Sequence, residues 1–456
     1  MNKILLILFV SACMVACSKK NKYAYGEFNP KNIKEQVFKI ALNRDTILKT
    51  KSGVLLKFGA KTFKNAGSKD VEVIVKEIIS KADILKSGVP TLDEKGQLLE
   101  SGGMMNIMTN PKLDINPDAP IQVSIPTEGA NVRMKKYTAD IDNGDFLWKN
   151  PQPLAQNPSF DALIQGEQLF IEHCASCHSK NLSDKLTGPP LGCLEIGENK
   201  RSREWLLKYT KNSQKMIAQG DKIAVAKWLE YRPTVMTNFE FLTDLQINQI
   251  YNFIDNESIR QNICDGNTFR KYISIESIVN DSGGYSLTYE PIMNNNLEPA
   301  ANEPIASDDN MSSQRIINYT RTINNDTFSR TYYYTFPVYN YQWINCDCNF
   351  WDGQAVDAFD VFAEANLEIF LIFKNRKALW PFVRWKGHYI LIETEDEPTV
   401  TLPMSEPVTL LAFDKLKDGK RSFCELQTAI KSVNDIQLKL QNISENEFQK
   451  ILKKYE

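Results

Sequence analysis

The sequence predicts a multidomain chain in which an all-α segment lies between two mainly-β, sandwich-like domains. Short runs with period-two alternation, such as 71–75, occur early in the chain and again late, as at 367–373. Between them, residues 242–254 carry apolar side chains at helical spacing. At 456 residues the chain is long enough for about three domains.

The N-terminus has the pattern of an exported protein. A basic start at Lys3 is followed by the apolar run 4–10, which is too short to span a bilayer. The stretch Met-Val-Ala-Cys at 14–17 resembles the bacterial lipobox, in which the cysteine becomes the lipid-modified first residue. We therefore predict a lipoprotein signal peptide at 1–16 and lipidation of Cys17. An ordinary signal that ends in a chance cysteine is the alternative.

Turn-rich joints divide the remaining chain. Asn, Pro and Gln fill 150–153, and residues 280–312 are rich in Asn, Ser, Asp, Gly and Pro. The predicted parts are a tether at 17–37, a β-sandwich-like domain at 38–150, a helical domain at 155–260, a linker at 261–312 and a β domain with a C-terminal helix at 313–456. Because the joints imply few contacts across them, the helical domain is expected to fold alone.

The most specific motif is Cys174-Ala175-Ser176-Cys177-His178. Two thiols at this spacing can each add to a vinyl group of one haem, and the adjacent histidine can bind its iron. A thioredoxin-like dithiol needs a strand-to-helix junction, and zinc needs a second pair of cysteines or histidines nearby. We predict one covalent haem c, attached through Cys174 and Cys177, with His178 as the proximal iron ligand.

Around this motif, residues 160–258 resemble class I cytochrome c domains. The resemblance rests on a helix at 161–170, the stretch Thr-Gly-Pro-Pro-Leu at 187–191 and the helix at 242–254. It implies that Gly166 and Phe170 on the first helix pack against Tyr251 on the last. A glycine without a side chain lets two helix backbones approach closely, which explains its presence in a helix.

The same resemblance implies two further contacts of the iron. The carbonyl of Pro189 or Pro190 is expected to orient His178. The family also places a methionine ligand on a loop before the last helix, where this chain has Met236. Thr237 stands where the family has a proline, which is a departure from the pattern.

Three alternatives to Met236 remain at the sixth iron position. Met216 lies on a predicted helix, where a packing role is the simpler interpretation. His173 directly precedes Cys174 and is too close in the chain to reach the far face of the same haem. Open coordination is the third alternative. A thioether ligand would raise the reduction potential relative to a second imidazole.

The other cysteines suggest structural roles. Cys193 could pair with Cys264, although connectivity cannot be deduced from sequence. Cys346 and Cys348 would share one face of a strand, and a disulfide with Cys424 plus one buried thiol is favoured over a metal clip. His388, far from the motif, is expected to be structural.

These patterns indicate an electron-transfer protein and not an enzyme. A six-coordinate iron has no free site for substrate, so an oxidase or peroxidase would need an open position. The expected place is the bacterial envelope, on the periplasmic side of the outer membrane, with the N-terminal lipid as the membrane contact. The expected partner is a redox protein. A net charge of −2 gives no sign of a nucleic-acid partner, and none is expected.

The β domains leave a second function open. The stretch 99–104 resembles β modules of bacterial envelope lipoproteins, which carry no catalytic residues to transfer. These domains could bind a carbohydrate or a protein. The alternative function is therefore a ligand-binding or adhesion lipoprotein in which the haem domain serves as a redox sensor.

Overall fold

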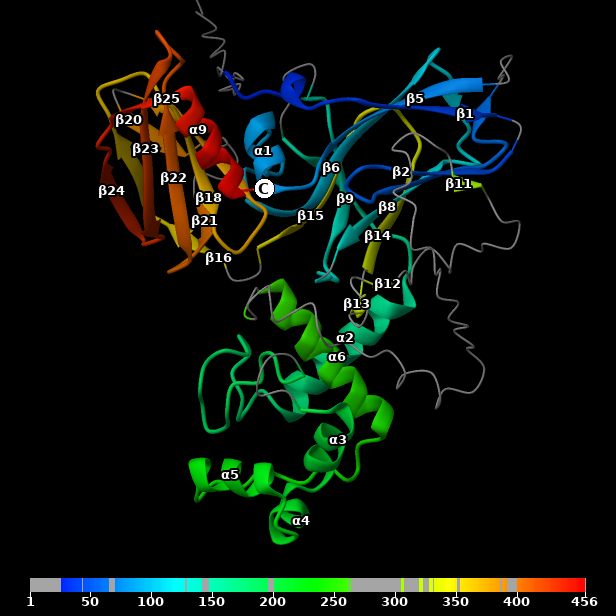
Figure 1. Ribbon diagram of the computed structural model, residues 1–456, viewed down its shortest axis with the longest axis vertical. Coiled ribbons are helices and arrows are strands. Elements are labelled where there is room, and N and C mark those ends of the chain that lie inside the picture. Colours follow the sequence, from blue (N-terminus) through cyan, green and yellow to red (C-terminus); the bar gives the residue numbers. More distant parts are fainter. Residues whose placement is uncertain are drawn as a thin grey trace, which may run out of the picture.

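The computed structural model describes residues 26–42, 44–64, 70–127, 129–141, 147–195, 201–261, 263, 305–306, 320–322, 328–330, 332–350, 353–385, 388–391 and 400–455. Its main sheets gather at one end of the molecule and a helical part projects from the other end (Figure 1). None of the helices within these ranges is long and apolar enough to cross a membrane.

The first β part is a sandwich of a six-stranded sheet, β1-β5-β6-β15-β9-β10, and a five-stranded sheet, β11-β2-β3-β8-β14. Alternate side chains from both sheets meet in one apolar core. Its elements are η1 (Pro30–Asn32), β1 (Gln36–Ala41), β2 (Thr46–Lys49), β3 (Leu55–Phe58), β4 (Phe63–Lys64), β5 (Asp70–Ile78), α1 (Lys81–Ser87), β6 (Leu99–Asn110), β7 (Asp114–Ile115), β8 (Ile121–Thr127), β9 (Lys135–Ala139), β10 (Lys149–Pro153), β11 (Ile305–Ala306), β14 (Tyr332–Val338) and β15 (Trp343–Asn349).

Two strands of this sandwich follow the helical segment in the sequence. β14 pairs with β8 over all its residues, and β15 lies between β6 and β9 within the six-stranded sheet. The helices are therefore inserted into a single sandwich, and the predicted boundary at 313 is wrong, because residues 332–349 belong to the first β part. Alternation shows which face of a strand is buried but not which sheet it joins.

The predicted joint before the helices is itself a strand. β10 forms an edge of the six-stranded sheet and pairs with β9. Pro151 and Pro153 are tolerated there because the outer side of an edge strand needs no hydrogen-bond donor. The expectation of few contacts across this joint is wrong, since Phe160 and Leu163 of the following helix belong to the sandwich core.

The predicted tether is shorter in the structure than in the sequence analysis. Phe28 is only 5% exposed, and its ring centroid lies 4.9 Å from that of Phe413. The carboxylate of Glu27 accepts hydrogen bonds from both terminal nitrogens of Arg421. From Gly26 onward the chain is thus part of the fold, whereas Cys17 lies outside the described residues.

The second β part is a half-barrel of eight strands in the order β24-β17-β20-β19-β18-β22-β23-β25, with β17 and β24 parallel. Its capped C-terminal helix confirms the helix expected near 442–454. The elements are β16 (Gly353–Val356), β17 (Ala358–Phe362), β18 (Glu368–Phe373), β19 (Leu379–Trp385), β20 (His388–Leu391), β21 (Val400–Pro403), β22 (Pro407–Phe413), β23 (Lys420–Ala429), β24 (Val433–Gln437), β25 (Gln441–Ser444), α9 (Glu445–Leu452) and η3 (Lys453–Tyr455).

A second apolar core joins the two β parts. It combines Trp148 and Trp343 of the sandwich with Phe370 and Phe413 of the half-barrel and Phe448 of α9. The two β parts therefore share a buried apolar interface and are not independent domains joined only by a linker.

The helical part is α2 (Pro158–His173), α3 (Arg203–Lys211), α4 (Ser213–Ala218), α5 (Lys222–Tyr231) and α6 (Asp244–Arg260), with the short strands β12 (Thr320–Thr322) and β13 (Phe328–Arg330) later in the chain. The side chain of Asn157 caps α2, and Thr243 forms a capping box with Gln246 on α6. The helices predicted at 161–170 and 242–254 are confirmed, and both are longer than predicted. Most of the predicted linker, 261–312, lies outside the described residues.

Replacing Phe336 by alanine should lower the free energy of unfolding by about 3–5 kcal/mol, because it empties a fully buried ring position in the sandwich core. Urea unfolding followed by tryptophan fluorescence measures the change. Tyr339→Ala is the matched control, since that ring lies just beyond β14 and is 43% exposed. Equal midpoints for the two variants would contradict the inclusion of β14 in this core.

Candidate haem-binding site

The site is built on the crossing of α2 and α6. A Cβ atom on Gly166 would collide with the carbonyl oxygen of Gln249 and lie 2.7 Å from its carbonyl carbon. Only glycine permits this backbone approach, so the predicted role of Gly166 is confirmed. The aromatic partner differs from the prediction: the ring of Phe170 meets Phe253, with centroids 5.4 Å apart.

Tyr251 has other contacts in the same core. Its hydroxyl lies 2.6 Å from that of Thr210 at the end of α3, and the guanidinium of Arg203 lies 5.3 Å from its ring centroid. Tyr251 and Phe253 are two positions apart, so they point in different directions from the helix. Tyr251 therefore ties α6 to α3, whereas Phe253 forms the crossing with α2.

The Cys-x-x-Cys-His motif forms the turn that ends α2. The backbone N–H of Cys174 donates to the carbonyl of Phe170, and the N–H groups of Cys177 and His178 both donate to the carbonyl of Cys174. Both cysteines are free thiols, Cys174 partly buried and Cys177 exposed. Burial raises the pKa of Cys174 to about 12, with a smaller effect from Cys177, so the group is a neutral thiol at neutral pH.

His178 is held by the stretch that follows it. Its Nδ1 lies 2.7 Å from the carbonyl oxygen of Pro189, which confirms that contact and assigns it to Pro189 instead of Pro190. The side chain is only 8% exposed. Burial lowers the pKa of His178 against the opposite effect of the Pro189 carbonyl, which favours the neutral imidazole that binds metals.

Gly188 is a site residue that the sequence analysis missed. A Cβ atom there would lie 2.6 Å from Cε1 and 2.8 Å from Nδ1 of His178. Its own N–H donates to the carbonyl of Cys177. The imidazole therefore occupies the space that any side chain at 188 would take. The sequence feature that could have identified Gly188 is its position directly before Pro189.

Met236 belongs to the apolar cluster that surrounds the motif. The cluster includes Leu169, Phe170, Cys174, Ala175, Leu182, Leu191, Leu194, Trp205, Leu206, Leu207, Met236, Phe239, Leu242, Ile247, Ile250, Tyr251, Phe253, Ile254 and Ile263. Within the described residues, Met216 is not a member. The hydroxyl of Ser213 donates to the carbonyl of Met236, which ties the methionine loop to the start of α4.

The remaining histidines have structural surroundings. The ring of His173 lies against Phe239 and Phe241, with centroids 6.1 and 5.5 Å away. His388 Nε2 lies 3.0 Å from a carboxylate oxygen of Asp360 in the half-barrel. The position of His388 agrees with the structural role expected for it.

Arg203 links the helices around the site through ion pairs. The sequence analysis missed this residue as well. Its guanidinium forms ion pairs with Glu195 and Asp255 and donates to the carbonyl of Asn248. The side chains of all three charged residues are less than one fifth exposed. This cluster joins α3, α6 and the end of the loop that carries Leu191 and Leu194.

The disulfide predictions have mixed outcomes. Cys193 is disulfide-bonded, and its predicted partner Cys264 lies outside the described residues. The expected disulfide between Cys346 or Cys348 and Cys424 is wrong, because all three are free thiols. The first two face the sandwich core and Cys424 faces the half-barrel core. No group of three or more metal-binding side chains occurs in the described ranges.

The donor set suits a covalent haem. Two thiols lie at the end of a helix beside a neutral imidazole whose Nδ1 faces a carbonyl, so that Nε2 can bind iron. An apolar cluster with a thioether completes the surroundings.

Comparison with known families agrees with this geometry. Residues 163–258 match the family model described as Cytochrome c. Comparisons with curated proteins and with solved structures give no match. The matched range begins in α2, includes the motif and ends in α6. Such domains carry covalent haem c, function in electron transfer and are typically extracytoplasmic. The helical insertion in this chain, from α2 to α6, is a cytochrome c domain.

Proposed function

We propose that this protein is a lipid-anchored, extracytoplasmic c-type cytochrome that transfers single electrons through one covalent haem. The main support for the proposal is that the His178 ring is held in one orientation by two neighbouring residues, an arrangement called here the clamp on His178. The Pro189 carbonyl orients the imidazole through Nδ1, and Gly188 leaves the space that the ring occupies. A histidine with only a structural role would not need its ring held against a glycine beside two free thiols.

Each residue of the motif has one task in this proposal. Cys174 and Cys177 would form the two thioether bonds, and His178 would bind the iron through Nε2. When bound, the haem supplies a one-electron redox centre. The apolar cluster excludes water from it, and the buried Arg203–Asp255 pair keeps α3 and α6 together around it.

Met236 is the proposed sixth ligand. It shares the apolar cluster with Cys174, and its loop is tied to α4 through Ser213. A thioether favours Fe(II) and gives a higher reduction potential than a second imidazole. Occupation of the sixth position leaves no site for substrate, which favours electron transfer over catalysis.

The proposed anchor is a lipid on Cys17, and the proposed location is the periplasmic side of the outer membrane. The signal-like segment 1–16 supports export, and covalent haem attachment in bacteria takes place outside the cytoplasm. The proposed partner is another redox protein of the envelope.

Alanine at Gly188 should reduce covalent haem attachment severalfold, because the new methyl group must displace the His178 ring. In-gel haem staining after denaturing electrophoresis, normalised to protein, measures the attached fraction. Thr187→Ala, an exposed neighbour, is the matched control and should match the parent.

The double variant Cys174→Ala/Cys177→Ala provides the baseline for this experiment and should carry no covalent haem. Undiminished staining in the double variant would refute the proposed function itself. Parental staining in Gly188→Ala alone would refute only the clamp on His178.

Met236→Ala should keep its haem attached but show a lower reduction potential and bind carbon monoxide at the vacated sixth position. Met216→Ala is the control, and it should resemble the parent in both respects. Visible spectra with and without carbon monoxide, together with a redox titration, make the comparison. A parental spectrum and potential in Met236→Ala would remove Met236 as the ligand.

Cys17→Ser should release the protein from membranes, because the proposed lipid is its anchor. Fractionation at high salt, which removes proteins held only by charge, measures the released share. Haem content should stay unchanged. Continued membrane association under these conditions would count against lipidation of Cys17.

A further inference from the structure

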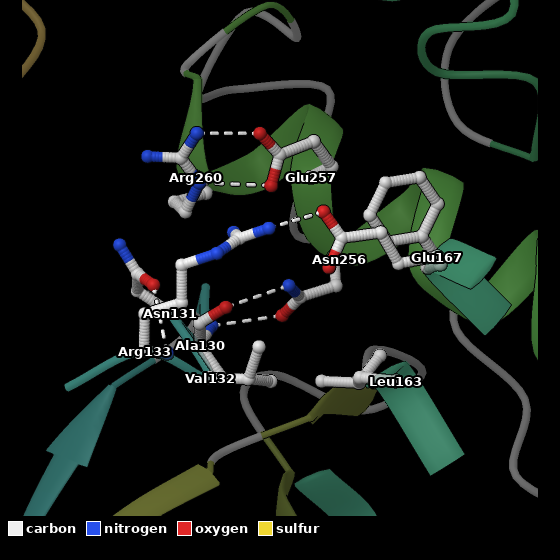
Figure 2. Close-up of a pocket in the computed structure, with 10 residues that line it drawn as sticks. Ala130, Asn131, Val132, Arg133, Leu163, Glu167, Asn256, Glu257 and Arg260 are labelled. Atoms are coloured by element: carbon white, nitrogen blue, oxygen red, sulfur yellow. Dashed lines mark hydrogen bonds and ion pairs between the residues drawn. The ribbon is translucent and has the colours of Figure 1, made fainter. Parts of the chain in front are cut away.

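The cytochrome c domain meets the sandwich through a buried polar contact at the C-terminal end of α6 (Figure 2). The side-chain amide of Asn256 accepts a hydrogen bond from the N–H of Ala130 and donates one to its carbonyl, each at 2.8 Å. Asn256 is only 5% exposed. A Cβ atom on Gly129 would lie 2.9 Å from the backbone nitrogen of Arg260. Helix and β loop are therefore in direct backbone contact.

The N-terminal end of α2 is embedded in the sandwich beside this contact. Phe160 and Leu163 are 7% and 3% exposed and belong to the sandwich core. The ring of Phe160 packs edge-on against Tyr334 of β14, with centroids 5.8 Å apart. The start of α2 and the end of α6 are thus both in contact with the sandwich.

A series of ion pairs extends the contact from the cytochrome c domain to the half-barrel. Glu100 of β6 lies 3.4 Å from a terminal nitrogen of Arg260 in the cytochrome c domain and 3.7 Å from one of Arg376. Arg376, in the turn between β18 and β19, also pairs with Glu406 at 2.8 Å. Arg260 in turn pairs with Glu257 of its own helix. The Glu100 side chain is only 13% exposed, so these pairs are little screened by solvent.

The contact between the cytochrome c domain and the sandwich lies between the half-barrel and the helices α4 and α5 (Figure 1). Glu27, the second described residue, is bound to Arg421 of the half-barrel. The helices α4 and α5 lie at the opposite end from the half-barrel (Figure 1). The described chain therefore begins on the β side, and the cytochrome c domain projects away from that point.

We infer that Glu100 is a positioning residue, which holds the cytochrome c domain in one orientation on the β scaffold by binding Arg260 and Arg376 at once. The functional meaning of this orientation rests on the proposed function, since the orientation fixes the direction in which the proposed haem domain faces relative to the β parts. A domain held in one pose has less orientational freedom to lose when a redox partner docks. Loss of the Glu100 charge removes the carboxylate shared between the two domains and leaves Arg260 paired with Glu257 and Arg376 paired with Glu406.

The test measures the pose of the domain in the full-length protein without using the haem as a probe. Nitroxide side chains are introduced as non-canonical amino acids at Lys222 on α5 and Lys450 on α9, both exposed. Pulsed electron spin resonance then gives the distribution of distances between them. The parent should give one narrow distribution, and Glu100→Gln should broaden it at least twofold. Glu94→Gln, at an exposed glutamate, is the matched control and should stay narrow.

A second pair of variants separates positioning from folding. Arg260→Met should broaden the distribution as Glu100→Gln does, whereas Arg260→Lys, which keeps the charge, should restore most of the narrow width. Arg260→Met decides the question if Glu100→Gln does not fold. A broad distribution in the parent, or parental widths in both charge-removing variants, would overturn the inference. Haem content of the same samples, read by in-gel haem staining, tests the proposed function separately, and distances are compared only between samples of equal haem content.

Discussion

The backbone contact between α2 and α6 at Gly166 is the constraint on which the cytochrome c domain depends. Because the position has no side chain, α2 can lie against the Gln249 carbonyl, and Phe170 and Phe253 then pack around the crossing. One end of α2 leads to Cys174 in the proposed haem site, and its other end places Phe160 in the sandwich core. A single close approach thus orients the proposed redox site and the attachment to the scaffold together.

The site itself depends on a second glycine contact, which serves an imidazole instead of a helix. Gly188 provides the space for the His178 ring, and the next residue, Pro189, provides the carbonyl that orients it. A proline has no N–H, so at this position the backbone can only accept a hydrogen bond. Backbone groups thus orient the imidazole, and a side chain is not needed for this task. Arg203 then ties α3 to α6 and to the preceding loop through the little-exposed carboxylates of Asp255 and Glu195.

The insertion of a cytochrome c domain between strands of one sandwich changes how the protein can work. A domain on flexible linkers samples many poses, whereas this domain shares core residues, side chain–backbone hydrogen bonds and ion pairs with its scaffold. The second core, between sandwich and half-barrel, extends this continuity to the C-terminal helix. The arrangement suits a carrier whose redox centre must be presented in a constant direction, and the β parts then act as its support.

Local patterns in the sequence determined the candidate chemistry and the element types. Cys174, Cys177 and His178 lie within five consecutive residues, so their potential for haem attachment can be recognised without any fold, and helical or alternating periodicity locates α2, α6 and several strands. Only the tertiary structure decided which segments meet. It assigned β14 and β15 to the first sandwich, selected Phe253 over Tyr251 and placed Cys424 in a different core from Cys346. The physical reason is that periodicity encodes which face of an element is buried, whereas the choice of partner depends on the packing of the whole core.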